Sequence, residues 1–231
     1  MKTLARWLKR LLLLLLGLAC LWFFWLFGWV LYWGKVDPGM TRFMELRLAE
    51  LREKNPQAQL RQQWVPYERI SIHLKRALIA AEDAKFVDHE GFDWEGIQKA
   101  IEKNEKKGRF AAGGSTISQQ LAKNLLLTPS KTFWRKGNEV VITLMLEYSW
   151  SKRRIFEVYL NVIEWGDGVF GAEAAARHYY GISAAALGPE QAARLASMVP
   201  NPRFYDRHRA TPGLARKSAI ILKRMPAAEV P

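Results

Sequence analysis

One uncharged apolar run near the N-terminus constrains this chain more than any other feature. Residues 11–33 read LLLLLLGLACLWFFWLFGWVLYW and contain no charged side chain. A helix of that length rises about 34 Å, which is enough to cross the roughly 30 Å hydrocarbon layer of a bilayer. Trp29, Tyr32 and Trp33 gather at its far end, as aromatic residues do at membrane interfaces. We therefore predict one N-terminal transmembrane helix that acts as a signal anchor.

The residues in front of this run predict its orientation. Residues 1–10 carry four basic side chains and no acidic one. Positive charge is retained on the cytoplasmic side of a membrane. Residues 1–10 are therefore expected to form a cytoplasmic basic tail, and the chain that follows the run is expected to be exported.

Two other readings of the apolar run fit it less well. A cleaved signal peptide has an apolar stretch of only 7–15 residues before a cleavage site of small residues, whereas this run continues well past Gly17 and Ala19. A lipoprotein site at Cys20 would also require cleavage inside the run. We interpret Cys20, the single cysteine, as a small apolar residue of the membrane helix, and one cysteine excludes an intrachain disulfide.

The charge balance bears on the partners of the exported part. The chain has 35 Lys and Arg against 22 Asp and Glu, a formal net charge of +13. Such an excess suits an anionic partner, which can be a phosphate, an acidic membrane surface or nucleic acid. An ordinary solvated surface is the alternative. Nucleic acid is not expected, because the basic part is predicted to lie outside the cytoplasm.

Apolar residues recur at helical spacing through the exported part, and no stretch alternates long enough to predict a useful strand. We therefore predict an all-α domain, with residues 55–69 and 106–114 as connections. The expected helices are 38–54 starting at Pro38, 71–86, 93–105 with Asp93 as N-cap, 116–127 with a capping box of Thr116 and Gln119, 132–150, 151–165, 171–180, 189–198 and 212–225.

Four segments differ from ordinary helix surface. Residues 82–91 (EDAKFVDHEG) gather four acids and a histidine at a helix end, where a solvated terminus is the plain alternative. A metal site there is less well supported, because no second histidine follows at ligand spacing. Residues 113–124 (GGSTISQQLAKN) place glycines before a helix start whose free N–H groups suit an anion. A flexible linker and a capped helix are the alternative, and the nucleotide P-loop pattern is absent.

The other two segments are charged. Residues 135–139 (RKGNE) put Arg135 and Glu139 one helical turn apart, as in an ordinary surface ion pair. Residues 152–161 (KRRIFEVYLN) have the pattern of a basic amphipathic helix.

In this order and spacing, the four segments resemble the glycosyltransferase domain of family 51, which bifunctional penicillin-binding proteins share with monofunctional peptidoglycan glycosyltransferases. The patterns E-D-x-x-F-x-x-H-x-G and G-G-S-T-x-x-Q-Q-x-x-K-N match in full, and R-K-x-x-E is present. In K-x-x-I-x-E-x-Y-L-N, Phe156 stands where leucine is usual, which bears only on local packing. The likeness covers about residues 60–225. No transpeptidase domain follows in this sequence, so the monofunctional enzymes are the closer match.

The resemblance implies an all-α, lysozyme-like domain that polymerises lipid II into β-1,4-linked glycan strands for the cell wall. The donor would be a strand α-linked to a lipid pyrophosphate, so the transfer inverts the anomeric centre. Residues 34–59 are then expected as a membrane-proximal helical segment and 60–231 as the periplasmic glycosyltransferase domain. The implied location is the cell inner membrane, crossed once.

The resemblance also implies roles for individual residues. Glu82 would be the catalytic base, and Glu139 a second catalytic carboxylate that organises the cations on the donor side. The implied substrate-binding residues are Thr116, Gln120, Lys123, Arg135, Lys136 and Lys152. The motif residues expected to support the site are Asp83, Phe86, His89, Gly91, Gly114, Ser115, Asn124, Glu157, Tyr159 and Asn161.

Cofactors and protein partners are less constrained. The resemblance implies no cofactor that is certainly required, and it leaves open a divalent cation, Mg or Mn, at the pyrophosphate. The implied partners are lipid II, the lipid-linked strand and the inner membrane, with other cell-wall synthesis or division proteins left open. Two competing functions remain: a membrane-tethered, lysozyme-like glycan hydrolase, which would also need two carboxylates, and a non-catalytic cell-wall scaffold.

Overall fold

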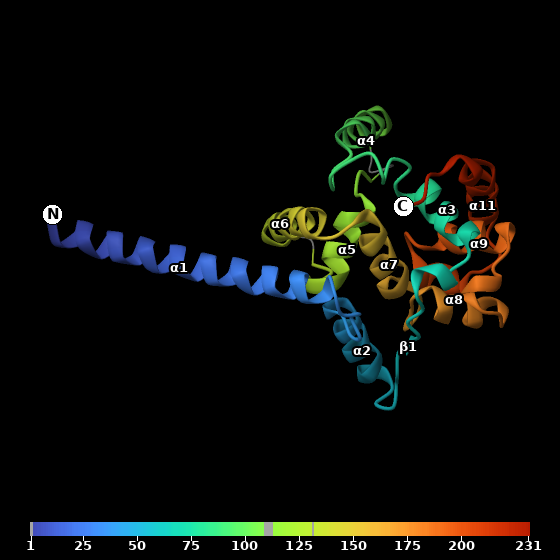
Figure 1. Ribbon diagram of the computed structural model, residues 1–231, viewed down its shortest axis with the longest axis horizontal. Helices are drawn as coiled ribbons and strands as arrows, with labels where there is room; N and C mark the ends of the chain where they lie inside the picture. Colours follow the sequence, from blue (N-terminus) through green and yellow to red (C-terminus); the bar gives the residue numbers. More distant parts are fainter. Residues whose placement is uncertain (1, 109–112, 131) are drawn as a thin grey trace.

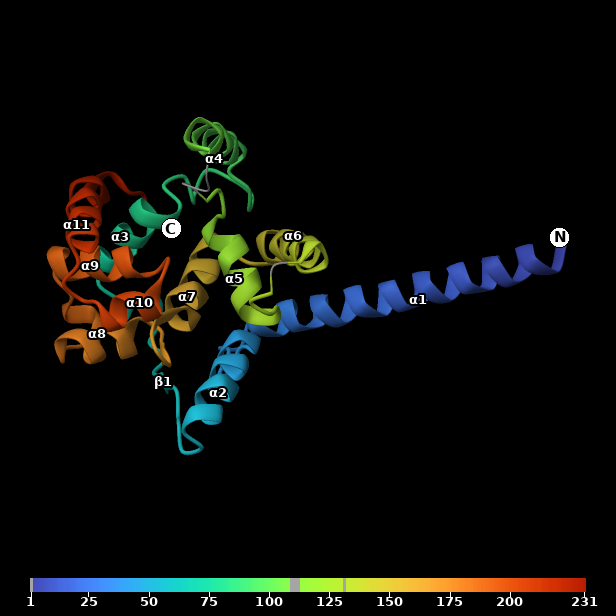
Figure 2. The same cartoon turned by 180° about the vertical axis from the view of Figure 1, so that it is seen from behind.

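The computed structural model describes residues 2–108, 113–130 and 132–231. A long N-terminal helix projects from a compact helical body (Figures 1 and 2). The predicted all-α, lysozyme-like fold class with one N-terminal apolar helix is confirmed. In chain order the α-helices are α1 Lys2–Trp33, α2 Arg42–Lys54, α3 Ile72–Glu82, α4 Trp94–Lys107, α5 Ile117–Leu126, α6 Phe133–Ser149, α7 Lys152–Val162, α8 Ala172–Tyr180, α9 Pro189–Met198, α10 Pro202–Arg207 and α11 Pro212–Arg224.

Helix α1 has the length and composition of a membrane span over Thr3–Trp33, and nearly all of that span is exposed. It starts at Lys2, so the basic tail forms the first turns of the same helix. Only its C-terminal end packs on the body, where Leu26 and Val30 are buried. An apolar helix with a bare surface is stable only where lipid replaces water.

Side chains from the body hold the C-terminal end of α1. The Trp150 indole donates a hydrogen bond to the Val30 carbonyl at 2.8 Å. The Arg154 guanidinium donates to the Trp33 carbonyl at 2.9 Å and to the Val36 carbonyl at 3.1 Å. These donors satisfy carbonyls that the end of a helix leaves without partners. The direction of the anchor relative to the domain is therefore set by specific contacts.

Helix α2 begins later than predicted. Pro38 lies in the connection after α1, and the helix starts at Arg42, where the Thr41 hydroxyl accepts a hydrogen bond from the Met44 N–H. A capping hydroxyl satisfies a free N–H group, so Thr41 fixes this boundary better than the proline does. Helix α2 packs on α5. The segment 34–59, expected as a separate membrane-proximal piece, thus contributes a helix to the body.

The centre of the body is made by α3, α5, α7, α9 and α11, whose apolar faces form one core. Figure 1 shows α5 and α7 on one side, toward α1, and α3, α9 and α11 on the other. Most predicted helices are present, with boundaries shifted by a few residues. The predicted N-caps at Asp93 and Thr116 are confirmed, including the capping box with Gln119. The connection expected at 106–114 falls partly outside the described residues.

Three short strands and helix α10 were not predicted. The strands are β1 Arg61–Gln62, β2 Glu164–Gly166 and β3 Val169–Phe170, in the order β1-β3-β2. Strand β1 runs parallel to β3, and β2 runs antiparallel to it. The helix expected to reach residue 165 ends at Val162, because the chain turns there into β2. Strands of two or three residues are too short to show a period of two. Three 3₁₀ turns complete the part of the chain that the structure describes: Tyr67–Arg69, Ala184–Ala186 and Met225–Ala227.

Candidate active site

Glu82 lies at the C-terminal end of α3 and is held by a side chain from α5. The Gln120 amide donates a hydrogen bond from Nε2 to Glu82 Oε2 at 2.9 Å. Burial raises the pKa of Glu82 above its ordinary value, and this hydrogen bond opposes the rise. A carboxylate with a raised pKa binds a proton more readily, as a general base must.

A buried tyrosine fixes the orientation of Gln120. The Tyr159 hydroxyl, fully buried on α7, donates to Gln120 Oε1 at 3.0 Å. Because Oε1 accepts from Tyr159, the amide must turn its N–H side toward Glu82. Tyr159, one of the predicted supporting residues, therefore acts through Gln120 and does not contact Glu82 through a hydrogen bond of its own.

Two lysines lie close enough to Glu82 to lower its pKa. Lys217 on α11 and Lys123 on α5 both stabilise the ionised carboxylate. Burial lowers the pKa of each lysine, and Glu82 opposes that change. Within residues 2–108, 113–130 and 132–231, neither ammonium makes a hydrogen bond or an ion pair of its own. Lys217 belongs to none of the predicted motifs, and only its place on a distant helix brings it to Glu82.

The second predicted carboxylate, Glu139, sits in a cationic cluster on α6. It is buried, and its two oxygens pair with Arg135 and Lys136. Glu139 is also the charge that most strongly favours the protonated form of Lys123. Lys123 is therefore close enough to both carboxylates, Glu82 and Glu139, for each to stabilise its protonated form.

A histidine–aspartate pair holds the motif loop, which is the segment 82–91 at the end of α3. The Gly91 N–H donates to His89 Nδ1 at 3.1 Å, which leaves Nε2 to carry the proton of a neutral ring and donate it to Asp83 Oδ1 at 2.9 Å. Asp83 Oδ2 accepts from the Ile117 N–H at the start of α5 at 3.0 Å. His89 thus links the Asp83 carboxylate to the Gly91 backbone, an arrangement compatible with the scaffold role predicted for it.

Gly91 is required at its position for two reasons. Its φ is +89°, which favours glycine, and a Cβ there would lie 2.8 Å from Thr143 Cγ2. Phe86 is buried beneath the same loop and packs on Phe156, the residue that departs from the usual leucine. The larger ring is therefore accommodated in the core.

Two side chains that were expected to contact substrate, Thr116 and Lys152, make hydrogen bonds within the protein. Thr116 is 2% exposed, its hydroxyl donates to the Gly91 carbonyl at 2.7 Å, and the same oxygen accepts from the Gln119 N–H. The structure therefore gives Thr116 a scaffold role instead of the substrate contact expected for it. Lys152 donates to the His89 carbonyl and to Glu147 Oε1, so its ammonium holds the motif loop against α6.

Most remaining supporting residues hold the scaffold. Glu157 accepts from the Tyr67 N–H, and the Asn161 side chain pairs with both backbone groups of Val65. Asn124 donates to the Gln120 carbonyl at 2.8 Å. Gly114 packs closely on Ile97, with 3.0 Å between the place of a Cβ and that residue. Ser115 is exposed beside Glu82 in a small pocket.

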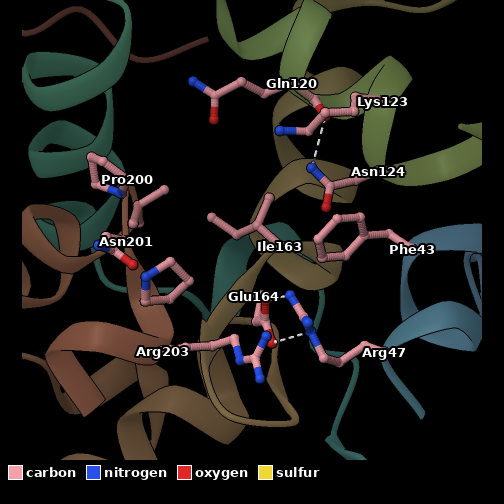
Figure 3. Close-up of a pocket in the computed structure, with 12 residues that line it drawn as sticks. Phe43, Arg47, Gln120, Lys123, Asn124, Ile163, Glu164, Pro200, Asn201 and Arg203 are labelled. Carbon is pink, nitrogen blue, oxygen red and sulfur yellow. Dashed lines mark hydrogen bonds and ion pairs between the residues drawn. The ribbon is translucent and has the colours of Figure 1, made fainter. Parts of the chain in front are cut away.

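Glu82 and Gln120 each line a different pocket. The smaller, of about 180 Å³, is lined by Glu82, Gly114 and Ser115. The larger, of about 360 Å³, is lined by Gln120, Lys123 and residues of α2, β2 and α10 (Figure 3). The hydrogen bond between Gln120 and Glu82 thus connects a residue that lines the larger pocket with one that lines the smaller.

A buried ion-pair network forms the far wall of the larger pocket. Arg47 of α2 pairs with Glu164 of β2 at 2.9 Å, and the pair is shielded from solvent (Figure 3). Burial raises the pKa of Glu164, and Arg47 opposes that rise. Arg203 of α10 reaches back to Glu50 of α2 at 2.8 Å. The network ties α2 to the rest of the body, and the sequence alone did not predict it.

The donor side does not offer a set of metal ligands. Its one carboxylate, Glu139, already uses both oxygens on Arg135 and Lys136. Among the described residues, no group of three or more His, Cys, Asp or Glu side chains could hold a metal ion. The described residues on the donor side therefore do not fit a divalent cation of their own.

Comparison with known proteins now defines the class. A family model described as Transglycosylase matches residues 48–226. This chain belongs to the transglycosylase family. The monofunctional resemblance is confirmed, and the protein is a peptidoglycan transglycosylase, a glycosyltransferase of cell-wall synthesis.

Individual relatives match along nearly the whole chain. The biosynthetic peptidoglycan transglycosylase of Dechloromonas aromatica (strain RCB) is 78% identical over 231 residues, covering 100% of both chains. Proteins with the same description from Azoarcus sp. (strain BH72) and Methylobacillus flagellatus are 63% identical over 231 residues and 64% identical over 220 residues. The first covers 100% of both chains, and the second covers 95% of this chain and 96% of the relative.

Proposed function

We propose that Glu82 is the general base of an inverting glycosyl transfer from a lipid-pyrophosphate-linked strand to lipid II. The observation that carries the proposal is a carboxylate that lines a pocket, accepts a hydrogen bond from Gln120 and lies close to Lys123 and Lys217. One displacement at the anomeric carbon turns an α-linked donor into a β-1,4-linked product. Glu82 takes the proton from the acceptor 4-hydroxyl as that oxygen attacks.

The cations of α5 and α6 are the proposed partners of the leaving pyrophosphate. As the glycosidic bond breaks, negative charge develops on the phosphate oxygen, and fixed positive charge lowers the barrier. Lys123 is half-buried, and its ammonium has no hydrogen bond or ion pair with any residue that the structure describes, so it is the first candidate. Arg135 adds a planar donor group suited to phosphate. Glu139 holds Arg135 and Lys136 in place, which makes it a positioning residue in this scheme.

We also propose the location. Helix α1 would cross the cell inner membrane once, with Lys2, Arg6, Lys9 and Arg10 in the cytoplasm and the body in the periplasm. The Trp150 and Arg154 contacts at the end of α1 hold the body close to the membrane surface, where both lipid-linked substrates reside.

The test is polymerisation of labelled lipid II in liposomes by wild type and Glu82→Gln. We expect glycan strands from wild type and a loss of at least 100-fold in the variant, with unchanged binding of lipid II. Turnover of Glu82→Gln near the wild-type rate would refute Glu82 as the base. Release of soluble muropeptides from finished strands would instead favour a hydrolase.

A second variant tests the proposed donor phosphate site independently of the base. Lys123→Ala should weaken binding of the lipid-linked donor, whereas Lys99→Ala, an exposed lysine paired with Glu95, should leave donor binding unchanged. Equal donor affinity in Lys123→Ala and wild type would remove Lys123 from the phosphate site.

A further inference from the structure

A third pocket, an apolar groove, lies where the end of α1 meets the body. It has a volume of about 570 Å³ and runs between the last turns of α1 and the start of α6. That volume is typical of small-molecule sites. Four tryptophans of α1 form one wall: Trp22, Trp25, Trp29 and Trp33.

The aromatic wall is ordered by specific contacts. Trp22 and Trp25 stack at 5.0 Å, and Trp29 and Trp33 lie 4.9 Å apart. The Trp22 indole donates to Asn138 Oδ1 of α6 at 2.8 Å. This bond satisfies the only polar atom of Trp22 and joins the two walls of the groove. The groove is therefore a formed surface with fixed side chains.

One residue is shared between this groove and the cationic cluster. Arg135 lines the groove, and its guanidinium also pairs with Glu139. The opposite wall carries Leu126 and Trp134, and Trp134 is 74% exposed. The groove is thus charged at one end and apolar along its length. That is the complement of an amphiphile with an anionic head and a long apolar tail.

We propose that this groove holds the first part of the polyprenyl chain of the donor. The inference rests on the proposed function, in which Arg135 and Lys123 receive the donor pyrophosphate. A pyrophosphate on Arg135 would bring the attached chain directly to the aromatic wall. The acceptor lipid belongs near Glu82, and the small pocket that Glu82 lines contains no residue of α1.

The groove acts through geometry more than through affinity. A polyprenyl chain in a bilayer already lies in an apolar medium, so moving it onto tryptophans yields little hydrophobic free energy. Packing instead fixes the direction of the chain and reduces the freedom of the attached sugar. Its effect should therefore appear as better presentation of the donor for transfer.

The experiment uses the full chain in liposomes and a polyprenyl pyrophosphate with a diazirine in the isoprene units nearest the phosphate. After illumination, labelled residues are mapped by mass spectrometry. We expect labels on Leu126 and Trp134, reduced at least threefold in the double variant Trp25→Ala, Trp29→Ala. Phe24→Ala is the matched control, because Phe24 lies at the same depth but outside the groove and is 66% exposed.

Two outcomes would overturn the proposal. One is labelling of Phe24 and Leu21 as strong as that of Leu126 and Trp134. The other is equal labelling by the same polyprenol without its pyrophosphate, which would make the groove a general lipid contact. Polymerisation by wild type is measured in the same liposomes. Labelling of the groove without polymerisation would contradict the proposed catalytic roles but support the groove as a lipid site. Polymerisation without labelling of the groove would support the catalytic roles and refute the groove as the site of the polyprenyl chain.

Discussion

The hydrogen bond between Tyr159 and Gln120 allows a sharp test of how the candidate base is tuned. Tyr159→Phe keeps the buried ring and removes only the hydroxyl that donates to Gln120 Oε1 at 3.0 Å. Without that donor, the amide is free to turn its oxygen toward Glu82. The hydrogen bond that lowers the pKa of Glu82 would then weaken or be lost.

The size of the effect follows from one hydrogen bond. A buried hydrogen bond contributes about 0.5–1.5 kcal/mol, and one pKa unit corresponds to about 1.4 kcal/mol. The pKa of Glu82 should therefore rise by up to about one unit. Because a base must be deprotonated, the acid limb of kcat/KM should move to higher pH by the same amount. On that limb the rate falls by up to about tenfold, and above it the rate is nearly unchanged.

The assay is a pH series of lipid II polymerisation for wild type, Tyr159→Phe and Tyr179→Phe. The Tyr179 hydroxyl donates to the Trp165 carbonyl at 2.8 Å, so the control loses a similar bond away from Gln120. An acid limb that stays in place in a folded Tyr159→Phe variant would refute the proposed tuning. An equal shift in Tyr179→Phe would show that the effect is not specific to Gln120.

Three further predictions concern stability. Glu82→Gln should raise the melting temperature at neutral pH by about 2–4 °C per kcal/mol gained, because burial raises the pKa of Glu82 and so disfavours its ionised form in the folded state. In a thermal series the gain should shrink as the pH falls through the raised pKa of folded Glu82, and it should be absent below the pKa of an unfolded glutamate. Thr116→Val should lower the melting temperature by about 2–4 °C, because it removes an N-cap that contributes about 1 kcal/mol. An unchanged melting temperature together with a raised KM for the donor would instead show that Thr116 contacts the substrate. Arg47→Met should cost about 3–5 kcal/mol in denaturant unfolding by leaving Glu164 buried without its cation, whereas adding Glu164→Leu should recover most of it; an Arg47→Met variant as stable as wild type would show that Arg203 suffices.

Local patterns were reliable where local forces decide the structure. The capping hydroxyl of Thr116 and the carboxylate of Asp93 satisfy N–H groups within three residues, so both helix starts were predictable. The apolar run 11–33 predicted the long helix because length and hydropathy alone set that outcome. The pair of Arg135 and Glu139 was also predictable, since both residues share one helix face.

The motifs predicted which residues gather at the site but not what each one does there. Thr116 was expected to touch substrate, and the fold buries its hydroxyl beneath the Gly91 carbonyl. Lys152 was expected on the phosphates, and the fold directs its ammonium to Glu147 and His89. Burial and the partner across a helix interface cannot be read from spacing within one segment.

Sequence by itself determined the apolar N-terminal helix, the all-α body and the residues that gather around Glu82, because each of these depends on composition, period or a short motif. Tertiary structure alone brought Lys217 to Glu82, set the amide of Gln120 through Tyr159, and formed the groove between α1 and α6. Gln120 and Glu82 are 38 residues apart in the chain, and Tyr159 lies a further 39 beyond Gln120. Contacts across such separations depend on how helices pack, and packing is decided by the whole core at once.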